Sequence, residues 1–184
     1  MAARAAGLVL LGGVLAGCGA PSPAFRARFE GEELRFDFEV QGIRSGASPR
    51  VREIPPGQGP SDRMLGLEPG PGTVVWLYHF EDDGTPLKDE DRAFSLALAL
   101  EDLRPGAVDF PSERAAAVFF CDNWGRGFRA AEARAVEGRL AVREAGERVV
   151  AGDLDLVLEG YKQRPDGSRE PFRLRLEGRF RASR

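Results

Sequence analysis

Two stretches near the C-terminus constrain the fold of this 184-residue chain more than any other feature. In residues 150–158 and again in residues 172–180, every second residue is apolar or glycine. Arginine and glutamate fill the positions in between in the second stretch. Side chains of a β-strand point alternately to its two faces, so this period of two predicts two strands that each bury one face.

The segment between these stretches, Arg-Pro-Asp-Gly-Ser at residues 164–168, predicts the turn that joins them. Pro followed by Asp fits a type I turn, and Gly167 supplies the left-handed residue of a three-residue hairpin loop. Both apolar faces then lie on the same side, which a one-residue slip would destroy. Counting outward from Arg164 and Ser168 predicts these pairs: Glu159 with Arg173, Asp155 with Glu177, and Asp153 with Arg179.

Charge alone would favour a different register for this hairpin. A shift of two residues would match Asp155 with Arg179 and remove the like-charge pair of Asp155 with Glu177. We expect the turn to decide, because solvated charges can rearrange and a turn backbone cannot. If the preceding strand turns near Gly146, Arg139 lies beside Asp153 and continues the row to Arg179.

Earlier segments also have the patterns of strands, although two of them contain many helix-forming residues. Alternation favours strands over residues 94–103 and 130–144, and Gly138 would weaken a helix in the second. In that second segment, Val136, Gly138, Leu140 and Val142 are expected to share one face. The other predicted strands are residues 25–29 and 34–40 as a hairpin, 64–67, 73–80 and 114–121.

Segments rich in proline, glycine or polar residues separate these strands. Residues 42–63 predict a long surface loop with at most one short edge strand, residues 69–72 end the strand at 64–67, and residues 122–125 form a turn. The pattern as a whole predicts an all-β fold. We expect a meander-rich β-sandwich or partly open β-barrel of about eight to ten strands.

The N-terminal segment has the composition of an export signal. One cation, Arg4, precedes an apolar run at residues 8–15, and small residues then lead to Cys18. The apolar run is far shorter than the roughly 20 residues that a bilayer-spanning helix needs. The chain is therefore divided into a signal peptide at 1–17, a Pro-containing tether at 18–24 and a single all-β domain at 25–184.

The sequence Leu15-Ala16-Gly17-Cys18 resembles the lipobox of bacterial lipoproteins. The resemblance implies cleavage before Cys18, which would carry a diacylglycerol and fatty acyl chains. Gly19 lacks the mark that retains such proteins at the inner membrane, which implies the outer membrane. A plain signal peptide with an incidental cysteine is the alternative.

Short glycine motifs further along the chain resemble a loose class of small, uncharacterised bacterial lipoproteins. These motifs are residues 25–31, 104–106, 137–142, 150–156 and 176–180. The resemblance implies an all-β domain and a cell-envelope location. It implies no catalytic residue and no cofactor.

The charge composition argues against nucleic-acid binding. Removal of residues 1–17, which contain Arg4 and no acid, leaves 25 basic and 29 acidic residues, a net charge of −4 without a basic stripe.

Once Cys18 is acylated, Cys121 is the only thiol, so no intramolecular disulfide can form. Cys121 follows Val118-Phe119-Phe120, and we expect it to be buried.

Two groups of residues could in principle carry chemistry. His79, the single histidine, could pair with Cys121 as base and nucleophile, with Asp122 or Asn123 as the third member. This requires hydrogen-bond contact, and a histidine packed in the core is the simpler interpretation. Six acidic residues at the ends of the segment 81–91 could bind Ca²⁺ or solvate a hairpin tip, with these calcium candidates: Asp82, Asp83, Asp89 and Asp91.

The sequence favours a non-catalytic protein, anchored by lipid in the cell envelope, that serves as a binding or structural module. Its partner could be an envelope protein or a glycan. A lipocalin-like carrier of an apolar ligand is the alternative, with Trp76, Tyr78 and Phe80 at the barrel mouth, although the Gly-x-Trp lipocalin signature is absent. A small hydrolase using Cys121 or loop carboxylates is the third interpretation.

Overall fold

The structure is a computed structural model that describes residues 24–29, 32–38, 40–51, 67–81, 92–125 and 127–183. Every regular element in these residues is a strand, which confirms the all-β prediction. None of the described segments is a helix that is long and apolar enough to cross a membrane. The strands are β1 (Phe25–Phe29), β2 (Glu32–Phe36), β3 (Val40–Val51), β4 (Leu67–Glu81), β5 (Arg92–Leu100), β6 (Gly106–Phe110), β7 (Ala115–Gly125), β8 (Phe128–Ala145), β9 (Val149–Gln163) and β10 (Arg169–Ser183).

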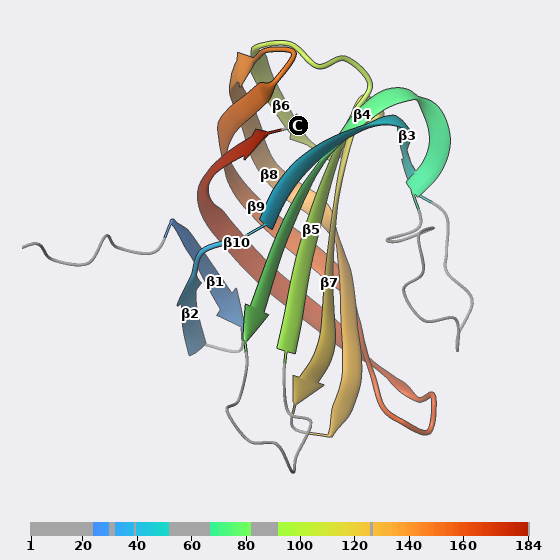
Figure 1. The fold of residues 1–184 in the computed structure, drawn as a ribbon. Coiled ribbons are helices and arrows are strands. Elements are labelled where there is room, and N and C mark those ends of the chain that lie inside the picture. The colour runs from blue at the N-terminus through green and yellow to red at the C-terminus, as the bar shows by residue number, and fades with distance from the viewer. Residues whose placement is uncertain are drawn as a thin grey trace, which may run out of the picture.

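Seven of these strands pair around a closed path (Figure 1). Each strand in the series β3, β4, β5, β7, β8, β9 and β10 is antiparallel to the next. β10 then returns to β3 through a short parallel contact at Ser183 and Gly42. Of the two predicted arrangements, the sheet is therefore the partly open barrel, with its weakest seam between β3 and β10.

The three remaining strands extend the barrel wall. β7 pairs with the first half of β8, and β6 pairs with the second half along the same edge. The β1–β2 hairpin attaches to β10 beside the seam, with Phe25 opposite Gly178. Phe25 and Phe38 are buried, and their rings meet edge to face at 4.7 Å between centroids. The hairpin thus adds apolar cover where β3 and β10 touch only briefly.

The last hairpin has the register that the turn predicts. The amide of Arg164 donates to Ser168 and that of Gly167 donates to Arg164, with Gly167 at a φ of 86°. Asp153 lies opposite Arg179 and Glu159 opposite Arg173. The amide and hydroxyl of Ser168 donate to the Asp166 carboxylate and lower its pKa.

The like-charge pair of Asp155 and Glu177 is present, and arginines compensate for it. Arg175 donates two hydrogen bonds to Asp155, at 3.0 and 2.7 Å, and this contact raises the pKa of Arg175. Arg26 lies 3.6 Å from Glu177. Turn geometry therefore outweighs charge matching in this register, because Asp155 has a diagonal partner on β10 and Glu177 lies opposite Arg26 on β1.

The predicted row from Arg139 through Asp153 to Arg179 is wrong. Arg139 lies opposite Asp155, and Ala141 lies opposite Asp153. The β8–β9 turn comes later than Gly146, and a β-bulge between Val142 and Glu144 shifts the register. The carboxylate of Asp153 pairs with Arg143 instead.

The predicted face of Val136 is wrong, because β8 contains a second bulge. The register with β9 shifts between Ala135 and Glu137, which leaves Val136 38% exposed. Leu140 and Val142 are buried as expected. One extra residue reverses the alternation, so a single parity cannot describe the whole strand.

Three predicted loops or strand ends are also wrong, because the strands continue through irregular pairing. Residues 42–51 belong to β3 rather than to a loop, and β4 runs through residues 69–72 with a register shift at Ala47. β7 includes residues 122–125, where Asn123 has a φ of 52°. Proline, glycine and a left-handed asparagine are compatible with bulges, so they did not end these strands. Residues 52–66, with most of the predicted strand at 64–67, lie outside the described residues.

A close approach of β8 and β9 requires glycine at position 160. A Cβ atom there would collide with the carbonyl oxygen of Glu132 and the Cα of Ala133, both on β8. These are backbone atoms of a paired strand, so they cannot move aside without a change in the sheet. By contrast, a Cβ at Gly146 would meet only the Val149 carbonyl, at 3.5 Å.

We predict that Gly160→Ala lowers the free energy of unfolding by about 2–3 kcal/mol, because β8 and β9 must separate locally. Gly146→Ala is the matched control and should stay within about 0.5 kcal/mol of the native protein. Chemical denaturation followed by circular dichroism measures both. Equal stability of the two variants would contradict the close approach.

Candidate functional site at one end of the barrel

The pair of His79 and Cys121 that a catalytic interpretation would require is not formed. Across β4, β5 and β7, His79 lies opposite Phe94, and Phe94 lies opposite Cys121. Two strand spacings separate the histidine from the cysteine, or about 10 Å. The imidazole stacks on the Phe94 ring, at 5.9 Å between centroids. Phe94 thus stands where a base would have to meet the thiol.

Cys121 is fully buried, as its apolar neighbours in sequence predict. Its thiol donates to the carbonyl of Asp122 at 3.3 Å. Burial raises the pKa of Cys121, because the thiolate would lose its hydration in the apolar core. A thiol that stays protonated is a poor nucleophile, so this environment does not activate Cys121.

His79 belongs to a small polar group at the ends of β4 and β5. Its Nε2 lies 3.6 Å from Glu81, and Arg92 donates to the same carboxylate from 2.9 Å. The Arg92 guanidinium also lies 5.9 Å from the centre of the Phe94 ring. A carboxylate can orient a histidine for proton transfer. The Glu81 carboxylate, however, lies closer to Arg92 than to His79, so it is mainly the ion-pair partner of Arg92.

Four aromatic side chains fill the barrel interior beside this group. The centroid distances within the set run from 4.8 Å, for Trp124 with Phe172, to 6.4 Å. Phe94, Phe119, Trp124 and Phe172 are all buried. The predicted turn at residues 122–125 gave Trp124 no place in the core. The bulge in β7 turns its side chain inward, and Trp124 is buried.

A second charged group lies at the same end, formed by side chains of β9, β10 and the turn between them around the Phe128 ring of β8. Lys162 and Arg164 each contact the ring of Phe128, at 4.5 and 4.4 Å from its centre. Arg164 also binds Glu170 through two hydrogen bonds, at 3.1 and 2.5 Å. Lys162 is buried and continues the inward-facing series of residues 150–158. This alternation, continued from residue 158 to residue 162, was the sequence signal from which the inward position of Lys162 could have been predicted.

The calcium candidates Asp82, Asp83, Asp89 and Asp91 lie outside the described residues, as does Cys18. Within the described part of the chain, no group of three or more histidine, cysteine, aspartate or glutamate residues could hold a metal ion. Calcium binding by the segment 81–91 therefore stays a prediction. Glu81, the one described acid of that segment, pairs with Arg92.

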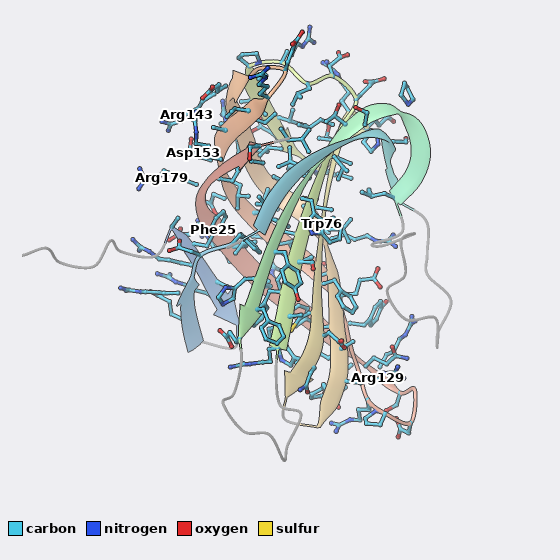
Figure 2. The ribbon with its side chains drawn as sticks, in the orientation of Figure 1. Phe25, Trp76, Arg129, Arg143, Asp153 and Arg179 are labelled. Atoms are coloured by element: carbon cyan, nitrogen blue, oxygen red, sulfur yellow. The ribbon has the colours of Figure 1, made fainter. Side chains whose placement is uncertain are left out.

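The aromatic residues that a carrier would place at the barrel mouth lie on the outer face of β4. Val75 and Leu77 belong to the main core, whereas Trp76 packs with Val74, Ala97 and Val118 in a separate cluster. Phe80 is 41% exposed. Figure 2 marks Trp76 on the wall formed by β4 and β5. Strand alternation explains the result, since residues 76, 78 and 80 have the opposite parity to the core residues.

Comparison of the chain with protein-family models, with curated proteins and with solved structures gives no match in any of the three. The resemblance to small bacterial lipoproteins therefore rests on the sequence motifs alone and stays a prediction.

We predict that a bulky aromatic disulfide reagent fails to modify Cys121 at neutral pH until the protein is unfolded. Burial blocks access and keeps the thiol protonated. Mass spectrometry of the peptide that contains Cys121 measures the modification. The exposed thiol of Ser183→Cys is the positive control and should react in the folded protein. Rapid modification of native Cys121 would instead support a catalytic thiol.

The raised pKa of Cys121 also predicts a dependence of stability on alkaline pH. The folded thiol stays protonated while the unfolded thiol ionises above about pH 8.5, so rising pH favours unfolding. Relative to Cys121→Ala, the native protein should lose about 1.4 kcal/mol of unfolding free energy per pH unit above that value. Denaturant titrations of both proteins over this range measure the difference. A constant difference would mean that Cys121 titrates normally in the fold.

Proposed function

We propose that this protein is exported, anchored by lipid at Cys18 in the bacterial cell envelope, and serves there as a non-catalytic binding or structural module. The observation that carries the non-catalytic part is the packing around Phe94. This ring separates the thiol of Cys121 from the imidazole of His79, and neighbouring aromatic rings fill the space beside them.

The packed interior favours a module over a carrier. A carrier needs interior volume for its ligand, whereas the inner faces of β5, β7 and β10 meet through buried aromatic and aliphatic side chains. The outer position of Trp76 points the same way, because a residue that the carrier would place at the barrel mouth packs outside the main core.

The anchoring part of the proposal rests on residues 1–18. The apolar run, the small residues and the cysteine occur in the order that lipoprotein processing uses. The first strand begins at Phe25, and five residues separate Cys18 from Ala24 at the start of the described domain. The outer membrane is the proposed destination, since Gly19 follows the cysteine.

We predict that cells fed a radiolabelled fatty acid incorporate the label into the native protein and not into Cys18→Ser. Stable attachment requires more than one acyl chain, so the native protein should partition fully with membranes and detergent. Cys121→Ala is the matched control, because it removes the other thiol and should retain the label. An unlabelled native protein would end the anchoring proposal, and a label lost only in Cys121→Ala would place the lipid elsewhere.

A further inference from the structure

Charge is unevenly distributed over the outer surface of the barrel. Strands β2, β1 and β10 are neighbours, and together they contain eight arginines and four glutamates, a net charge of +4. Strands β9, β8 and β6 follow in the same sheet, and they contain five basic and seven acidic residues, a net charge of −2. The protein is acidic overall, with a formal charge of −3, so the first group of strands is an exception.

The arginines of this first group are accessible. We call their outward-facing set the arginine surface, and its members are Arg26, Arg28, Arg35, Arg173, Arg175, Arg179 and Arg181. Six of these side chains are 52% to 64% exposed and contact carboxylates on the same surface or on β8 and β9. Arg179 is also exposed, and within the described residues it forms no ion pair, because Arg143 already pairs with the opposite carboxylate of Asp153.

The domain's N-terminal end lies in the arginine surface. Ala24 accepts a hydrogen bond from the amide of Arg179, and its own amide donates to the side chain of Asp37. Figure 2 shows Arg179 projecting from the same side of the barrel as Phe25 at the start of β1. Six Cα–Cα steps lead from Cys18 to Ala24, and they span about 20 Å when the chain is fully extended.

We infer that the arginine surface faces the phosphate groups of an anionic lipid bilayer and orients the barrel on it. The inference rests on the proposed lipid anchor at Cys18. An anchor on so short a tether keeps Ala24 within about 20 Å of the lipid, so part of the surface around Ala24 must approach the headgroups. Of the two groups of strands compared, the one with the net positive charge contains this attachment point.

Arginine chemistry suits this partner. A guanidinium offers planar pairs of N–H donors that bind phosphate oxygens, and it sheds water more readily than an ammonium group. The existing ion pairs do not prevent such contacts, because exposed pairs contribute little free energy and exchange partners readily. Lipid phosphates on a flat surface can also contact several arginines together, as the neighbouring strands β1, β2 and β10 present them.

The test uses the acylated protein with Ser183→Cys, reconstituted into vesicles of phosphatidylcholine alone or with phosphatidylglycerol added. A polarity-sensitive dye on this cysteine reports contact with headgroups, since Ser183 is exposed and shares the outward face of Arg181. Buried Cys121 should not take up the dye. We expect the emission to shift to the blue when phosphatidylglycerol is present and to return when salt is added, because salt screens the attraction.

Two double variants separate the arginine surface from general charge. Arg26→Gln with Arg179→Gln should reduce the lipid-dependent shift by about half or more. Arg129→Gln with Arg139→Gln removes the same charge from exposed positions of β8 that do not contact Asp153, and it should leave the shift unchanged. Circular dichroism of each variant verifies the fold. The salt response of the protein that carries only Ser183→Cys tests the electrostatic attraction without any change to the arginines.

The outcomes distinguish the orientation from the anchor. Protein that floats with vesicles but gives equal emission with both lipids overturns the arginine surface and leaves the anchor intact. A shift that follows protein density rather than phosphatidylglycerol means that a second copy covers this surface, and it also overturns the inference. Protein that leaves the vesicles in high salt overturns the anchor, because acyl chains hold a protein on lipid independently of salt, and it supports the electrostatic contact of the arginine surface.

Discussion

Strand β9 pairs along its length with β8 on one side and with β10 on the other, and the closed sheet depends on this double pairing. Residues 164–168 fix the β10 side, because the turn determines which residues of the two strands meet. Close backbone approach fixes the β8 side, where Gly160 leaves room for the carbonyl of Glu132. Once β9 is held on both edges, its alternate residues point into the barrel and form one wall of the core.

Bulges give this sheet the curvature that closure requires. Each adds a residue to one strand, increases the local twist and reverses which face the next residues occupy. In β8 the bulges leave Val136 exposed while Leu140 remains buried, and in β7 the irregular pairing brings Trp124 into the core. The same irregularities therefore bend the wall and bring one of the four aromatic rings, that of Trp124, into the end of the barrel.

Because side chains fill this end of the barrel, the residues that could have formed a catalytic site do not come together. Apolar packing buries Cys121 and raises its pKa, while Phe94 keeps the imidazole of His79 two strands away. Charged groups remain at the barrel end, but they neutralise one another, as Arg92 does Glu81. The outer surface is different, since its arginines stay hydrated and accessible on β1, β2 and β10. This face can contact a charged partner independently of the residues at the barrel end.

The sequence by itself determined the strand class, the final hairpin and the burial of Cys121, because these follow from local alternation, turn geometry and neighbouring residues. It predicted the register of Asp153 with Arg179 against the preference of the charges. Only the tertiary structure decided the partner of Asp153 on β8, the strand at residues 42–51, the inward position of Trp124 and the separation of His79 from Cys121. These depend on bulges and on which strands become neighbours. A bulge shifts every later pairing by one residue, and the alternation of apolar and polar residues does not show where the bulge falls.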